Sequence, residues 1–232
     1  MIMERTQAKN RLDTLIQEIP DRNRRILCTG LPGPAQARLV HRIYRETGLP
    51  VCVVLPTPKN VEGFLENLQF FCSDSNSLLS FPSYNLSPFK FVSYHNQTAA
   101  ERIRVLYRLT DRVSPPLLVT TAEALIQRIV PKQALLDFAE LVMAGEEIDR
   151  DGLIEKLVAG GYTRAAIVEE PGDFCVRGGI LDVFSPLYSE PLRIELFGDL
   201  VESLRLFSAS SQRTLQDISE AVILPEIGRA HV

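Results

Sequence analysis

The first half of the chain alternates between short apolar runs and amphipathic stretches. Residues 51–55 form a continuous apolar run, which is typical of a strand buried on both faces of a parallel sheet. The stretch after Pro58 carries apolar side chains at helical spacing through Leu68. Alternation of strands and helices predicts right-handed crossovers and a parallel sheet. The expected strands are 24–29, 51–55, 78–81 and 117–120, and the expected helices are 12–19, a segment from the turn at 30–34 through about 46, 58–68, 98–109 and 122–129.

The pattern changes after about residue 130. A helix is expected over 150–159, closed by Gly160 and Gly161, and short strands with turn signals follow it. Their spacing describes an antiparallel meander. We therefore expect an α/β domain over 1–130 and an α+β domain over 131–218, with a last strand within 219–232 that returns to the first domain. The strands expected in this second half are 135–143, 166–168, 174–176, 180–184, 192–197, 201–207 and 223–225.

Composition narrows the functional classes. Of 232 residues, 45% are hydrophobic and 23% are charged, as in ordinary globular proteins. The formal net charge of −4 argues against a uniformly basic nucleic-acid-binding surface. The chain has neither a signal-peptide core nor an apolar run near the ~20 residues of a membrane span, so we expect a cytoplasmic protein without membrane contact. No metal site is expected, because no C-x-x-C pair occurs among Cys28, Cys52, Cys72 and Cys175.

A glycine-containing loop lies where a phosphate-binding loop belongs, between an expected strand and an expected helix. A working loop reads G-x-x-x-x-G-K-[ST], in which lysine reaches the phosphates and a hydroxyl holds magnesium. Here Gly30 matches the first position and Gly33 lies inside the loop, but Ala35, Gln36 and Ala37 replace the second glycine, the lysine and the hydroxyl. Two prolines also remove backbone N–H donors. We therefore expect no ATP hydrolysis here, and the loop taken alone also fits an ordinary strand–helix turn.

The most distinctive segment lies in the second half. Residues 172–184 read G-D-F-C-V-R-G-G-I-L-D-V-F, residues 191–199 read P-L-R-I-E-L-F-G-D, and residues 211–214 read S-Q-R-T. This pattern resembles the one shared by UvrB and the transcription-repair coupling factors. The S-Q-R-T segment and the missing lysine favour the coupling factors, and the segments F-P-S-Y at 81–84 and E-R-I-R-V-L-Y-R at 101–108 resemble them more loosely.

The resemblance implies a fold and a role. It is to the N-terminal, UvrB-like region of these factors, and it implies a degenerate RecA-like parallel-sheet domain interrupted by an inserted α+β domain. In this family the insert docks onto UvrA, the damage-recognition ATPase of nucleotide excision repair. A full coupling factor binds RNA polymerase and translocates DNA through other domains, where ATP and magnesium are expected. The resemblance thus implies a non-catalytic adaptor module, without a cofactor of its own.

The docking residues that this resemblance implies are charged. Arg193 and Glu195 alternate with apolar neighbours, so in a strand they project from one face about 7 Å apart. Arg177 ends the preceding strand pair, and Arg164 is a further candidate. The alternative is a solvated sheet face whose ion pairs contribute under ~1 kcal/mol each. The motif match favours docking for Arg177, Arg193 and Glu195, and we expect Arg177→Ala and Arg193→Glu to weaken UvrA binding with the fold intact.

Other residues of the motif receive a structural interpretation. Asp182 and Asp199 are expected in turns or at a sheet edge without chemistry, and Glu169 and Glu170 are expected to be solvated. Gly178 and Gly179 predict a bend that needs a positive φ. The expected core residues of the motif are Phe174, Leu181, Val183 and Phe197.

Two other functions remain open from the residues alone. The chain could be a fragment of an NTPase or helicase whose missing half supplies the chemistry. It could also bind nucleic acid through the aromatic residues of segment 81–94, which offer a stacking platform but only Lys90 as a cation. This segment is shorter than the aromatic hairpin of UvrB, which argues against verification of DNA damage.

Overall fold

The computed structural model has a mixed α/β fold that divides into two compact units. The first unit comprises Met1–Phe81 and Arg112–Leu125, and the second comprises Pro82–Asp111 and Ile126–Val232. A parallel three-stranded sheet lies in the first unit, and a six-stranded and a two-stranded sheet lie in the second. The residues that the structure describes are 13–17, 19, 25–72, 77–84, 96–110 and 115–226.

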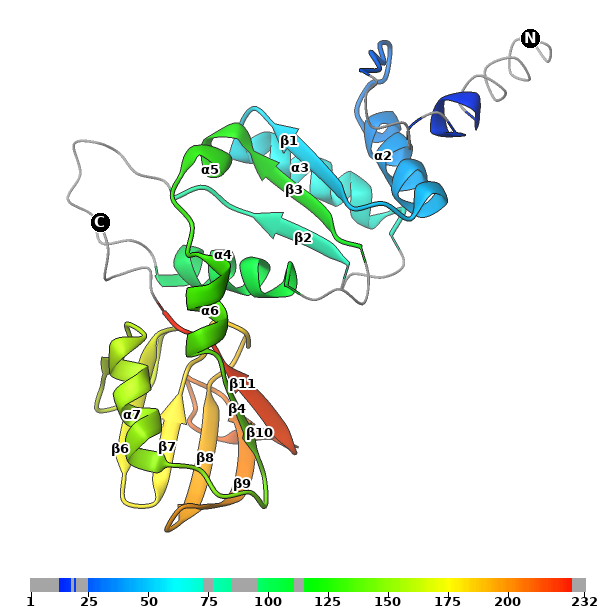
Figure 1. Cartoon of the computed structure of the whole chain (residues 1–232). Coiled ribbons are helices and arrows are strands. Elements are labelled where there is room, and N and C mark those ends of the chain that lie inside the picture. The colour runs from blue at the N-terminus through cyan, green and yellow to red at the C-terminus, as the bar shows by residue number, and fades with distance from the viewer. Residues whose placement is uncertain are drawn as a thin grey trace, which may run out of the picture. The chain divides into compact units, whose positions relative to one another are not determined.

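The first unit is a small parallel sheet with helices packed against it (Figure 1). Its strand order is β1-β3-β2, and the core contains Ala37 of α2, Phe64 and Leu68 of α3, and Val119 of β3. Helix α3 begins where the sequence predicts, because Pro58 occupies its first turn and Thr57 accepts a hydrogen bond from the Asn60 amide. The elements are α2 (Pro34–Thr47), β1 (Val51–Leu55), α3 (Pro58–Gln69), β2 (Leu78–Phe81), β3 (Leu117–Thr121) and α5 (Ala122–Ile126).

The second unit is built on a six-stranded sheet of order β10-β9-β8-β7-β6-β5. Neighbouring strands are antiparallel except the short pair β5 and β6, and strands β4 and β11 form a separate antiparallel pair. Its elements are α4 (Asn96–Arg108), α6 (Lys132–Phe138), β4 (Glu140–Met143), α7 (Arg150–Ala159), β5 (Thr163–Arg164), β6 (Asp173–Arg177), β7 (Ile180–Val183), β8 (Leu192–Phe197), β9 (Leu200–Phe207), β10 (Thr214–Ile218) and β11 (Glu220–Ile223).

The main core of the second unit lies on one face of the six-stranded sheet. Leu153 and Leu157 of α7 pack with alternate residues of β6 to β9, and with Val142 of β4 and Ile223 of β11. Helix α7 begins at an aspartate cap, since Asp149 accepts a hydrogen bond from the Gly152 amide. With one face covered in this way, the alternate side chains of the same strands project from the opposite face.

Most predicted elements are confirmed. The apolar run 51–55 is strand β1, the stretch after Pro58 is α3, and the antiparallel meander consists of β6, β7, β8 and β9. The core assignment is also confirmed for Phe174, Leu181 and Val183, each of which is fully buried.

Several predicted strands are wrong. Residues 25–29 are irregular and exposed, although their apolar composition predicts a strand. The expected strand 135–143 is instead helix α6 followed by β4, because Leu135 packs with α4 as a helical side chain. Residues 166–168 lie in a loop. The last strand is β11, at Glu220–Ile223 instead of 223–225, and it pairs with β4.

The units also divide the chain differently from the predicted boundary near 130. Helix α4 belongs to the second unit, where Ile103 packs with Leu135 and Leu224 in one cluster. Arg102 of the same helix is almost fully buried and donates to the carbonyl oxygens of Pro82 and Arg128. The position of α4 therefore depends on contacts with residues far away in the sequence, which no local pattern reveals.

Two findings concern the described part of the chain only. None of its helices is long and apolar enough to cross a membrane. Within the same residues, no group of three or more His, Cys, Asp and Glu side chains comes together in a way that could hold a metal ion.

Candidate functional site

The face of the six-stranded sheet opposite its main core carries charged side chains in two cross-strand rows. We call this the polar face. The register pairs Asp182 with Arg193 and Arg193 with Arg205 in the first row. The second row runs from Arg177 through Ile180 and Glu195 to Ser203. The first row continues to Cys175 beside Asp182 and to Asp217 beside Arg205. The residues of the polar face are therefore Cys175, Arg177, Ile180, Asp182, Arg193, Glu195, Ser203, Arg205 and Asp217.

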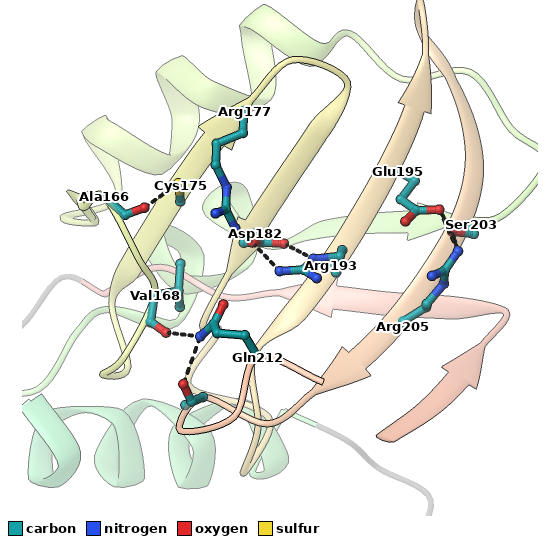
Figure 2. Close-up of polar contacts among 11 residues, drawn as sticks. Ala166, Val168, Cys175, Arg177, Asp182, Arg193, Glu195, Ser203, Arg205 and Gln212 are labelled. Atoms are coloured by element: carbon teal, nitrogen blue, oxygen red, sulfur yellow. Dashed lines mark hydrogen bonds and ion pairs between the residues drawn. The ribbon is translucent and has the colours of Figure 1, made fainter. Parts of the chain in front are cut away.

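Asp182 is the node of the polar face (Figure 2). Its carboxylate is 1% exposed and accepts hydrogen bonds from Arg193 Nε at 2.7 Å and Nη2 at 2.8 Å. It also accepts one from Arg177 Nη2 at 2.9 Å. A buried carboxylate must be paired, and the fork of an arginine suits both of its oxygens. The expectation that Asp182 lies in a turn or at a sheet edge is wrong, because it lies opposite Arg193 in β7, between β6 and β8.

Arg193 is held on more than one side. Its guanidinium lies 4.4 Å from the centre of the buried Phe207 ring, and the same group binds Asp182 in a fork. The hydrogen bonds to Asp182 raise the pKa of Arg193 above its usual value. Its side chain is 16% exposed, whereas that of Arg177 is 50% exposed. Arg193 is thus mainly a fixed part of the face, and Arg177 is the arginine that offers free donor surface.

This difference changes the expectation for one substitution. Arg193→Glu would place a second carboxylate beside the buried Asp182, and two like charges there would destabilise the sheet. The prediction that this variant keeps its fold is therefore not supported by the geometry. Arg177→Ala removes a half-exposed side chain and leaves the Asp182–Arg193 pair in place.

Glu195 forms a second, more exposed cluster on the polar face. It accepts hydrogen bonds from Ser203 Oγ at 2.8 Å and from Arg205 Nη2 at 2.5 Å (Figure 2). Arg205 also lies 3.5 Å from the exposed carboxylate of Asp217 on β10. Glu195 and Arg205 are each about one-third exposed, so this cluster presents both charges to a partner.

Two loops border the polar face at its other end. Gln212 has a φ of 58° and donates to the carbonyl oxygens of Ala209 and Val168, which ties one loop to the other (Figure 2). Beneath them, Val168, Cys175 and Phe207 form a small apolar cluster. Gln212 of the S-Q-R-T segment therefore has a structural position at the border of the face.

Arg164 lies away from the polar face. It is exposed on the edge strand β5, and its register partner is Phe174, a core residue. Register partners share a face of the sheet, so Arg164 belongs to the side opposite Arg177 and Arg193. Among the predicted docking residues, the structure brings together Arg177, Arg193 and Glu195, and leaves Arg164 apart.

The predicted core position of Phe197 is wrong. Its side chain is 75% exposed at the end of β8, next to Leu196, which is buried. Gly178 has the predicted positive φ of 56°. Gly179 is needed for another reason, because a Cβ there would lie 2.5 Å from the Leu196 carbonyl oxygen.

The loop before α2 has its helix-terminal amides in use. The Ala35 amide donates to the Pro32 carbonyl at 3.0 Å, the Gln36 amide donates to the Gly33 carbonyl at 3.1 Å, and Pro34 has no N–H. Ala37 is fully buried in the core of the first unit. The amides of Ala35 and Gln36 are therefore bonded within the loop, and position 37 holds a buried methyl group where a working loop has the hydroxyl that binds magnesium.

The aromatic segment 81–94 is described only in part. Phe81 is buried, and the Tyr84 ring lies 4.4 Å from the guanidinium of Arg102, so both take part in packing. Phe89, Lys90, Phe91 and Tyr94 lie outside the described residues.

Comparison with known proteins relates this sheet to a family of repair proteins. Residues 141–227, which contain the whole polar face, match the family model of the UvrB interaction domain. Over most of its length the chain is related to transcription-repair-coupling factors. It is 34% identical to the one from Myxococcus xanthus over 87% of the chain, 31% identical to that of Bacillus subtilis over 86%, and 30% identical to that of Escherichia coli over 84%. The chain spans 17% of the length of each of these relatives.

Proposed function

We propose that this chain is a non-catalytic adaptor module of transcription-coupled nucleotide excision repair, and that its polar face docks onto UvrA. The observation that carries the proposal is the Arg177–Asp182–Arg193 cluster. It fixes a half-exposed arginine on a rigid sheet inside a UvrB interaction domain. The relatives are named for coupling transcription to repair, which is the process proposed here.

The chemistry of the face suits a protein partner. Three arginines stand against three carboxylates, those of Asp182, Glu195 and Asp217, so the charges of the face balance. Positive charge is most accessible at Arg177, which can donate to a carboxylate of the partner. Because Asp182 already orients this side chain, little side-chain entropy remains to be lost on binding.

The proposal includes the absence of ATP hydrolysis by this chain. Its support is the occupied amides and the buried Ala37 of the loop before α2. RNA-polymerase binding and ATP-driven translocation on DNA are proposed for other domains of a longer protein, in keeping with the small share of the relatives that this chain spans. Incubation with Mg-ATP at millimolar concentrations is expected to release no inorganic phosphate above the buffer background, and phosphate release by the chain would contradict this part.

Calorimetric titration of the chain into purified UvrA tests the docking role. We expect binding by the wild-type chain and an affinity at least fivefold lower for Arg177→Ala, since a hydrogen bond to a charged group contributes about 1.5–3 kcal/mol. Arg38→Ala is the matched control, because Arg38 is an exposed arginine on α2 in the first unit, and it should bind like the wild type. Equal affinities for all three proteins would contradict docking through the polar face.

A further inference from the structure

An exposed phenylalanine lies beside the polar face and has no role in the core. Phe197 ends β8 with 75% of its side chain exposed, and its register partner Leu200 is 39% exposed. Large apolar side chains that stay exposed in a contiguous group often mark interaction sites. The pair forms the tip of the β8–β9 hairpin, next to the β6–β7 turn.

The pleat of β8 places Phe197 on the same face of the sheet as Arg177. Ile194 and Leu196 point into the core, so Arg193, Glu195 and Phe197 project from the other side. The register shift between β8 and β9 does not disturb this alternation, because the extra residue is on β9. Successive side chains on this face are spaced about 7 Å apart along the strand. Phe197 therefore forms a third row, beyond the row of Arg177, Ile180 and Glu195.

The backbone under Phe197 is firmly held. The Leu196 amide donates to the Gly179 carbonyl at 2.7 Å, which ties the tip to the β6–β7 turn. On the other side of the hairpin turn, the Ile148 amide donates to the Asp199 carbonyl at 2.9 Å. An aromatic side chain on a fixed backbone loses little conformational freedom when a partner binds it, which favours its use as an anchor.

The chemistry around Phe197 is mixed. Leu200 and the partly buried Ile180 extend its apolar surface, and Arg177 adds the accessible positive charge of the polar face. A complementary partner surface has an apolar pocket with a carboxylate at its rim. A centre of apolar contact surrounded by polar contacts is the usual anatomy of a protein interface.

We propose that Phe197 is the apolar anchor of the docking surface and enters an apolar pocket of UvrA, while Arg177 pairs with a carboxylate at the edge of that pocket. This inference rests on the proposed docking to UvrA and adds the residue that supplies its apolar contact. A second copy of this chain is the other occupant that the same patch could accept.

Calorimetric titrations into UvrA, with Phe197→Ala beside the wild type, test the anchor. The matched control is Phe70→Ala, since Phe70 is 85% exposed in the first unit. We expect Phe197→Ala to weaken binding at least tenfold with an unchanged melting temperature, and Phe70→Ala to bind as the wild type does. At higher salt the loss caused by Arg177→Ala should shrink, because charges are screened, while the loss caused by Phe197→Ala should persist.

Each other outcome has a distinct meaning. If the wild type binds, Arg177→Ala binds weakly and Phe197→Ala binds normally, the anchor is refuted while docking through the polar face stands. If the wild type does not bind UvrA, the proposed function and the anchor both fail. Sedimentation could also reveal that the wild type is a dimer and that Phe197→Ala is a monomer with unchanged UvrA affinity. That result would refute the anchor and show that Phe197 serves self-association.

Discussion

The buried carboxylate of Asp182 provides the sharpest test of how the polar face is built. We consider Asp182→Asn, which keeps the shape of the side chain and removes its charge. The amide oxygen can still accept one hydrogen bond from Arg193, but the amide nitrogen then faces an N–H group of Arg193 or Arg177. The variant therefore loses acceptors and leaves Arg193 without a counter-ion.

The size of the stability loss in Asp182→Asn follows from the burial of the three charged side chains. Breaking a fully buried ion pair costs about 3–5 kcal/mol, because it leaves an uncompensated charge. Asp182 is 1% exposed, but Arg193 is 16% exposed and Arg177 50%, so solvent offsets part of the loss. We therefore expect the free energy of unfolding of the second unit to fall by about 2–3 kcal/mol, at or just below the lower end of that range.

Urea unfolding followed by circular dichroism measures this change, since the chain contains no tryptophan. With a slope of about 2 kcal/mol per molar urea, the midpoint should fall by about 1–1.5 M. Asp217→Asn is the control, because Asp217 is 86% exposed and lies 3.5 Å from Arg205. It should change the midpoint by less than about 0.5 M, as a surface pair contributes under ~1 kcal/mol. Equal midpoints for Asp182→Asn and the wild type would refute the claim that the buried carboxylate stabilises the sheet.

Three further substitutions test other parts of the second unit. Gly179→Ala should lower the free energy of unfolding by about 1–3 kcal/mol, because its Cβ would lie 2.5 Å from the Leu196 carbonyl oxygen; an unchanged melting temperature would contradict the close approach. Tyr162→Phe should cost about 1–3 kcal/mol at pH 7, because the buried hydroxyl donates to the Leu224 carbonyl. Burial also raises the pKa of Tyr162, so the folded state keeps its proton while the unfolded state loses it above a pKa of about 10. The wild-type advantage over Tyr162→Phe should therefore be complete below pH 10 and shrink by roughly 1.4 kcal/mol by pH 11, and an advantage independent of pH would contradict this assignment. Arg164→Ala should change UvrA affinity less than twofold. A loss of affinity equal to that of Arg177→Ala would show that Arg164 is part of the docking surface.

Strand alternation is the part of this fold that the sequence carries most clearly. In β8, the core residues Leu192, Ile194 and Leu196 alternate with charged residues, and this alternation predicts that Arg193 and Glu195 share one face. Strict alternation also assigns Phe197 to the polar face. Its exposure was therefore predictable, and the core assignment gave too much weight to its apolar character. Strand β10 had no such signal, because its side chains are exposed apart from the partly buried Ile218.

Other features depend on contacts that local pattern does not encode. The pairing of β11 with β4 joins segments almost eighty residues apart, and the place of α4 is fixed by Arg102 and Ile103 through partners elsewhere in the second unit. Asp182 could have been placed opposite Arg193 from the alternation of β7 and β8. Its burial could not, since the side chains of Arg177 and Arg193 bind both of its oxygens in the folded sheet.

Photo-crosslinking of the chain to UvrA tests the central claim most directly. A benzophenone amino acid replaces Ile180, which lies in the polar face between Arg177 and Glu195, or Val158, which is 59% exposed on α7 across the sheet. Docking through the polar face predicts a covalent adduct with UvrA from position 180 and none from position 158. An adduct from position 158 alone would show that the opposite side of this unit meets UvrA, and would contradict the account.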